Sequence, residues 1–175
     1  EYFQKGEFSE AEAAFRAAIE ADPSSARAYY FHGLSASKID RTSEAAASFQ
    51  QALNLDPEQS DAYLQLGIAR YKLDQFEEAA QALDEAIKRL PEDANAIFFR
   101  GLTEQALERH ATSIPYFEDA GELDPSYTQL AYFNIGLAHY RMGENELAND
   151  AFARAVTLEP DSKTAEYARA FLERL

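Results

Sequence analysis

Histidine is the side chain best suited to acid–base chemistry near neutral pH and to metal binding. The chain of 175 residues has three histidines, His32, His110 and His139, which are far apart in the sequence. None of them has a second histidine at the spacing of a zinc motif such as HExxH. The segments that hold them are different predicted helices, so we interpret all three as packing residues and predict no metal site.

The other groups that could do chemistry do not form a catalytic pattern either. The neighbouring acids Glu77-Glu78 and Asp84-Glu85 lack the alternating Asp spacing of a calcium loop, and we interpret them as a solvated surface. The chain has no cysteine, no GxGxxG pattern and no glycine-rich phosphate loop. We therefore predict no catalytic residue, no cofactor and no enzymatic activity.

The composition is that of an acidic globular chain. Its net charge of −15 disfavours nucleic acid and anionic membranes as partners, since both would be repelled. No apolar run approaches the ~18–20 residues that span a bilayer, so we expect a soluble protein without direct membrane insertion. The absence of cysteine suits a reducing or an oxidising compartment, which leaves both the bacterial cytoplasm and the periplasm open. Residues 1–5 contain no initiator methionine and do not resemble a signal peptide, so we expect the chain to be a piece of a longer protein.

A recurring proline organises the sequence. Five prolines fall 34, 34, 34 and 35 residues apart, namely Pro23, Pro57, Pro91, Pro125 and Pro160. If each proline is the thirty-second place of a repeat, other places come into register. The eighth place is glycine, the twenty-fourth is Phe or Leu, and the twenty-seventh is always alanine. A fixed period of this length is typical of a stacked-repeat architecture.

The spacing of apolar residues within each repeat predicts two amphipathic helices of about 13 residues. The small residues let the two helices approach closely, and the large ones fill the space between them. Proline ends the second helix because it cannot continue the hydrogen-bond ladder. Ser9 with Glu12 and Asp74 with Glu77 have the spacing of capping boxes, which predicts the starts of two second helices.

The pattern Tyr63-x-x-Leu66-Gly67, Phe76-x-x-Ala79, Leu83-x-x-Ala86 and Pro91 resembles the tetratricopeptide repeat (TPR). The resemblance covers essentially the whole chain. It implies an all-α fold, a right-handed superhelical solenoid of antiparallel helix pairs whose first helices line a concave groove. We expect a single array over residues 1–175. Its parts are a partial first repeat at 1–23, full repeats at 26–57, 60–91, 94–125 and 129–160, and a capping helix or truncated sixth repeat at 161–175.

The repeat at 94–125 departs from the pattern. Pro115 lies where its second helix should continue, and a proline inside a helix costs about 3 kcal/mol. We therefore predict that this helix starts late, capped by Thr112 or Ser113, with Pro115 in its first turn. The alternative is a hinge between the neighbouring repeats.

In TPR proteins, ligands are contacted mainly from the first helices. The fifth and ninth places of these helices are apolar in all four full repeats, which predicts a continuous apolar stripe. Among its residues we expect Tyr30, Leu64, Ile68, Phe98, Leu102 and Phe133 to be the anchors, with Lys72 and Arg141 as polar orienters. The complete predicted groove set is Tyr30, Phe31, Leu34, Leu64, Ile68, Tyr71, Lys72, Phe98, Phe99, Leu102, Phe133, Leu137 and Arg141.

These observations favour a non-enzymatic protein–protein interaction scaffold that binds an apolar or amphipathic segment of a protein or peptide. Two alternatives stay open. One is a structural module that forms homo-oligomers through the stripe or its ends, and the other is an accessory domain of a larger envelope or enzyme assembly.

Overall fold

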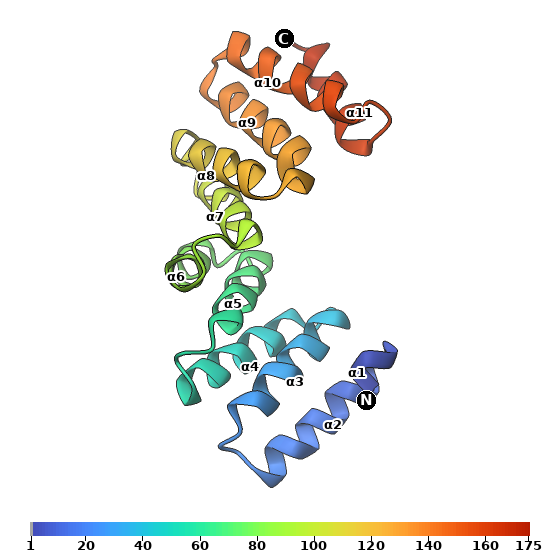
Figure 1. Cartoon of the computed structure of the whole chain (residues 1–175), viewed down its shortest axis with the longest axis vertical. Coiled ribbons are helices and arrows are strands. Elements are labelled where there is room, and N and C mark those ends of the chain that lie inside the picture. The colour runs from blue at the N-terminus through green and yellow to red at the C-terminus, as the bar shows by residue number, and fades with distance from the viewer. Residues whose placement is uncertain (1) are drawn as a thin grey trace. The chain divides into compact units, whose positions relative to one another are not determined.

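The computed structural model describes residues 2–175, and every regular element in this range is helical (Figure 1). The prediction of an all-α fold is confirmed. The helices are α1 (Tyr2–Lys5), α2 (Phe8–Ala21), α3 (Ala26–Lys38), α4 (Thr42–Leu55), α5 (Ser60–Lys72), α6 (Phe76–Arg89), α7 (Ala94–Ala106), α8 (His110–Leu123), the short 3-10 helix η1 (Pro125–Tyr127), α9 (Thr128–Met142), α10 (Asn145–Leu158) and α11 (Lys163–Leu172). Between Tyr2 and Leu175, no helix has the length and apolar character needed to cross a membrane.

The chain forms two compact units, an N-terminal unit (Glu1–Leu90) and a C-terminal unit (Pro91–Leu175). In the N-terminal unit, α4 packs against both α3 and α5, and α3 also contacts α5 directly. In the C-terminal unit, α8 packs between α7 and α9, and α10 packs between α9 and α11. In each unit the first helices of successive repeats therefore lie side by side, with second helices packed behind them. That the two units belong to one array over 1–175 stays a prediction.

A contact between a glycine and a large side chain holds each helix pair together. A Cβ built on Gly101 of α7 would lie 2.9 Å from the ring of Phe117 in α8, closer than real Cβ atoms approach other atoms. The Phe117 ring is fully buried against this bare stretch of backbone. Three further pairs are as tight: Gly33 with Phe49, Gly67 with Leu83, and Gly136 with Phe152.

Replacing Gly101 by alanine should therefore destabilise the protein by about 1–3 kcal/mol, because the added methyl group displaces Phe117. This loss outweighs the helix propensity of alanine, which is worth about 1 kcal/mol over glycine. Gly121 is the matched control, since a Cβ there would meet its nearest atoms at 3.4 Å, an ordinary contact. Urea unfolding followed by circular dichroism measures both changes. Gly121→Ala should be as stable as the wild type or more so, and an equally stable Gly101→Ala would contradict the packing argument.

The turn between the two helices of each pair contains one residue in the left-handed conformation. These residues are Gly6 (φ 79), Asp40 (φ 58), Asp74 (φ 58), Glu108 (φ 59) and Gly143 (φ 76). The predicted capping boxes are wrong, because neither Ser9 nor Asp74 is the N-cap of its helix. Asp74 forms the turn and α6 begins only after Gln75, while Ser9 lies inside α2.

The acid that precedes most of the prolines stabilises the turn between repeats. The Oδ1 atoms of three aspartates accept a hydrogen bond from the backbone N–H two positions later, in the pairs Asp22–Ser24 (3.0 Å), Asp56–Glu58 (3.1 Å) and Asp124–Ser126 (2.9 Å). Hydrogen bonds from the hydroxyl and the backbone of Ser24 also lower the pKa of Asp22 below its usual value. The side chain thus bridges over the proline and fixes the turn locally.

Three first helices, α3, α7 and α11, are capped by a side chain, whereas α5 and α9 are not. The side chains of Ser25, Asp93 and Ser162 accept hydrogen bonds from backbone N–H groups in the first turns of α3, α7 and α11. Gln59 has the same place before α5 and makes no such bond. Its Oε1 atom is buried without a hydrogen-bond partner.

Gln59→Asp should therefore stabilise the protein by about 1 kcal/mol, because a short carboxylate can accept the first-turn N–H bond that Gln59 does not. Ser25→Ala, which removes the equivalent cap of α3, should destabilise the protein by a similar amount. Thermal unfolding at neutral pH compares the two variants with the wild type. An unchanged or lower Tm for Gln59→Asp would show that the cap is not what limits α5.

Helix α8 runs without interruption through Pro115, so the predicted late start at Thr112 or Ser113 is wrong. Pro115 and Ala111 are both exposed, so water can reach the Ala111 carbonyl group, which has no helical N–H partner because of the proline. The Thr112 hydroxyl donates a hydrogen bond to Glu104 of α7 at 2.7 Å, and Ser113 is fully buried. These contacts hold the first turn of α8 on α7 and compensate for the proline.

Candidate functional site

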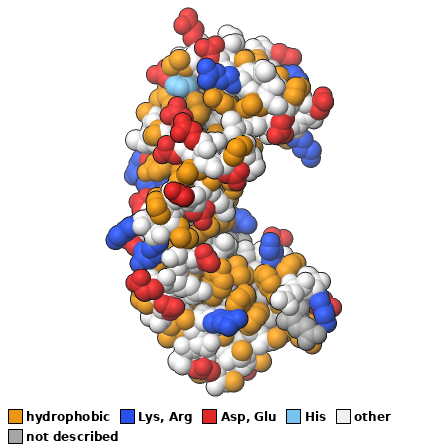
Figure 2. All heavy atoms as spheres, in the orientation of Figure 1, with side chains coloured by type: hydrophobic (Ala, Val, Ile, Leu, Met, Phe, Trp, Pro, Cys, Tyr) orange, Lys and Arg blue, Asp and Glu red, His pale blue; other side chains and the backbone are white. Residues whose placement is uncertain are grey.

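The candidate binding surface of the N-terminal unit lies along α3 and α5. Since α4 packs against both helices from behind, part of their other side remains open. Tyr30, Leu34, Ile68 and Tyr71 are half-buried here, and Lys72 is exposed. Figure 2 shows hydrophobic side chains gathered over the α3 part of this unit. We call these five residues the α3–α5 surface.

The two tyrosines of the α3–α5 surface are neutral at physiological pH. Burial raises the pKa of Tyr30, and the negative charge of Asp61 adds to the effect. Burial likewise raises the pKa of Tyr71, with a contribution from Asp74. Their hydroxyl groups therefore keep their protons at neutral pH.

Two of the predicted anchors belong to the core. Leu64 is 8% exposed and Phe98 is 6% exposed. The ring of Phe98 packs against Phe117 at 5.3 Å and against Tyr127 at 4.9 Å between ring centroids. These two residues have little surface to offer a partner, because neighbouring helices of the chain already cover them.

Phe31 and Phe99 occupy the same place in different repeats, and both are half-buried. The Phe31 ring stacks on Phe15 of α2 at 5.4 Å and meets Phe3 of α1 edge-on at 6.3 Å. Phe31 therefore packs against the preceding helices of its own chain, and its ring also meets Tyr30 of the α3–α5 surface edge-on at 5.4 Å between ring centroids.

In the C-terminal unit, α11 covers part of the predicted stripe. Phe171 of α11 contacts Phe133 at 6.2 Å and Tyr140 at 5.3 Å between ring centroids. Leu137 belongs to the same apolar cluster. Leu102 remains half-buried on α7, and Arg141 is exposed at the end of α9. The chain itself thus occupies this end of the stripe.

Comparison with known proteins agrees with this architecture. Models of the tetratricopeptide repeat match residues 1–60, 40–97 and 129–162. The chain belongs to the tetratricopeptide repeat family. No curated protein matches the sequence.

Several solved TPR structures are similar to this chain. MamA is 28% identical, with a TM-score of 0.84 over 91% of this chain and 92% of MamA. YrrB, described as a TPR protein with an unusual peptide-binding site, is 27% identical, with a TM-score of 0.87 over 97% of this chain and 87% of YrrB. MamA from Desulfovibrio magneticus RS-1 shares the fold at 21% identity, with a TM-score of 0.85 over 93% and 91% of the two chains.

Two of the histidines, His32 and His139, make polar contacts that the sequence analysis missed. Nε2 of His32 lies 3.0 Å from Glu12, and Nδ1 lies 2.7 Å from the Ser48 hydroxyl. All three side chains are buried where α2, α3 and α4 meet. Glu12 lies 20 positions before His32 and Ser48 lies 16 positions after it, so no local spacing in the sequence pointed to this network. His139 similarly contacts Glu144 at 2.6 Å.

Glu12, His32 and Glu44 bring their ligand atoms within 4.8 Å of one another, as a metal site would. However, Arg16 contacts both carboxylates, and Arg41 lies 3.7 Å from Glu12 and 3.8 Å from Glu44. The two guanidinium groups balance the two carboxylates, so a divalent cation would add charge that nothing compensates. The arrangement fits an internal ion network better than a metal centre.

A second ion network lies inside the C-terminal unit. Arg100 and Glu104 of α7 form an ion pair although both are more than 90% buried. Burial acts to raise the pKa of Glu104, but hydrogen bonds from Arg100 and Thr112 prevail and hold that pKa below its usual value. The carboxylate therefore stays charged, and the guanidinium of Arg100 also lies over the ring of Tyr116 at 5.1 Å.

Because the pKa of Glu104 is lowered on folding, its charge stabilises the folded state above the unfolded pKa, and the effect disappears as pH falls through the folded pKa. Glu104→Gln should cost about 1.5–3 kcal/mol at pH ~7, since it removes the charged acceptor of the hydrogen bonds from Arg100 and Thr112. The difference from the wild type should shrink below the usual glutamate pKa of 4.5. Urea unfolding over a pH series tests this. A difference that is the same in acid as at neutral pH would mean that shape, and not charge, is what Glu104 contributes.

Proposed function

We propose that this TPR protein is a non-enzymatic scaffold that binds an apolar or amphipathic segment of another protein on the α3–α5 surface. The observation that carries the proposal is the run of half-buried aliphatic and aromatic side chains along α3 and α5, with Lys72 exposed beside it. Apolar surface that a folded unit leaves open is a usual mark of an interaction site.

The α3–α5 surface suits this role for two physical reasons. Its residues lie on helices that α4 supports from behind, so they are already ordered and little conformational entropy is lost on binding. The Tyr30 hydroxyl and the ammonium group of Lys72 can pair with polar groups of the bound segment, which orients that segment. The description of YrrB as having a peptide-binding site supports a peptide ligand for this chain.

The corresponding residues of the C-terminal unit contribute less to the proposal. Phe133 and Leu137 are packed against α11, and Phe98 is in the core. Leu102 and Arg141 are proposed as additional contacts within the C-terminal unit by itself, while Leu34, Ile68 and Tyr71 form the centre of the α3–α5 surface.

The double variant Leu34→Asp/Ile68→Asp should weaken peptide binding by more than tenfold, roughly the loss of one buried anchor. Peptides selected from a displayed library against the full chain serve as probes, and fluorescence anisotropy measures their affinity. Leu55→Asp is the matched control, because Leu55 is a leucine of the same unit that is 38% exposed at the end of α4. It should bind as the wild type does, and circular dichroism should show that both variants keep their helices.

Equal binding by the double variant and the wild type would refute the α3–α5 surface as the binding site. Light scattering over a concentration series addresses the homo-oligomer alternative. Self-association that Leu34→Asp/Ile68→Asp abolishes would mean that a second copy, rather than another protein, covers this surface.

A further inference from the structure

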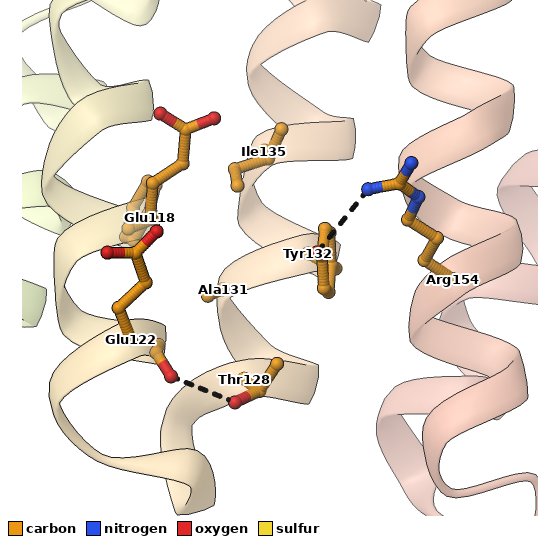
Figure 3. A pocket seen from close by; sticks show the side chains of 9 residues that line it. Glu118, Glu122, Thr128, Ala131, Tyr132, Ile135 and Arg154 are labelled. Atoms are coloured by element: carbon orange, nitrogen blue, oxygen red, sulfur yellow. Dashed lines mark hydrogen bonds between the residues drawn. The ribbon is translucent and has the colours of Figure 1, made fainter.

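A cavity of about 340 Å³ opens between α8, α9 and α10 in the C-terminal unit (Figure 3). The twenty-eighth place of the repeat explains it. This place holds Ile19, Leu53, Ile87 and Val156 in the other repeats but Gly121 in α8. Because Gly121 has no side chain, the space that a branched aliphatic residue fills elsewhere is left empty. The cavity is separate from the α3–α5 surface, since it is lined by two second helices of the other unit.

The chain around Gly121 is adapted to the missing side chain. The Thr128 hydroxyl donates a hydrogen bond to the Gly121 carbonyl group at 3.1 Å, as Figure 3 shows. Thr128 follows η1, which accommodates the one extra residue of the 35-residue spacing between Pro125 and Pro160. Two departures from the repeat therefore meet at the same cavity.

The lining of the cavity combines an apolar floor with an acidic rim. Phe117, Ala131 and Ile135 form the apolar part. Glu118 and Glu122 line it from α8, one helical turn apart and on the same face as Gly121. Neither carboxylate forms an ion pair with any residue between Tyr2 and Leu175. Like charges at this spacing repel each other, so a cation placed between them would be stabilised.

Arg154 of α10 lines the opposite wall of the cavity and contacts another residue of the chain. Arg154 lies over the ring of Tyr132 at 5.4 Å, and its Nη1 donates a hydrogen bond to the Tyr132 hydroxyl at 3.4 Å. The Arg154 guanidinium keeps its charge, but it is held on the Tyr132 ring, whereas the two carboxylates lie together on the α8 side of the cavity (Figure 3). The cavity therefore has acceptors for a positive group and room for an aliphatic stem.

We propose that this cavity binds the side chain of an arginine or lysine presented by a partner polypeptide. Such a side chain would lay its methylene groups on the apolar floor and place its charged head between Glu118 and Glu122. Arginine is the better fit, because its planar guanidinium group can donate to both carboxylates at once. The net charge of −15 would also speed the approach of a basic segment.

A short peptide with one arginine is the probe, and the same peptide with neutral citrulline is its control. Amide NMR spectra of the full chain, titrated with each peptide, report where binding occurs. The arginine peptide should give saturable shifts at residues 118–122 and 128–135, and the citrulline peptide should bind about tenfold more weakly or not at all.

Three variants make the test specific. Gly121→Val should abolish the shifts by filling the cavity, and Glu118→Gln/Glu122→Gln should abolish them without changing its shape. Glu166→Gln/Glu173→Gln removes two exposed carboxylates, one in α11 and one at its C-cap, and should bind as the wild type does. Equal weakening by both double variants would show unspecific attraction to an acidic protein and overturn the proposal. Binding of free spermidine at these residues without binding of the peptide would overturn it too.

Discussion

The close approach of a glycine to a large buried side chain is the constraint on which each helix pair depends. Since Gly33 and Gly101 have no side chain, the rings of Phe49 and Phe117 press directly on the backbone of the first helix. This contact sets both the separation and the rotation of the two helices. It therefore also decides which side of each first helix is buried and which is left open. The α3–α5 surface is a consequence of that packing rather than an independent feature.

Glycine has two opposite roles in this fold. At Gly101 it is needed because a neighbour occupies the space, whereas at Gly121 a Cβ would fit, with its nearest atoms at 3.4 Å, and the residue lines a cavity. A regular repeat buries its apolar residues in the same way each time, which gives stability but no distinct site. A hollow arises where one repeat drops a residue that the others keep. In a repeat protein, the positions that break the pattern are thus natural places to look for specific recognition.

The period of the sequence was sufficient to predict the helices, their pairing and the small-to-large contacts, because these depend on local spacing and residue size. The period did not predict how deeply the groove-facing side chains are buried. Leu64 and Phe98 have the groove-facing spacing, yet adjoining helices cover them, which depends on how neighbouring repeats stack. The predicted start of α8 was wrong because contacts with α7 outweigh the free-energy cost of placing Pro115 inside the helix. The polar partners of His32 were missed because they come from two other helices.

The contacts that hold this protein together join residues that are close in sequence. Gly101 and Phe117 belong to one helix pair, and the hydrogen bonds from Tyr127 to Asn95 and from Ser162 to Gln129 span 32 and 33 positions, about one repeat. Chains with such local contacts pay little loop-closure entropy and fold quickly. During synthesis, each helix pair can bury its glycine–aromatic contact before the ribosome has finished the next repeat. The nascent chain therefore exposes the apolar surface of about one repeat at a time.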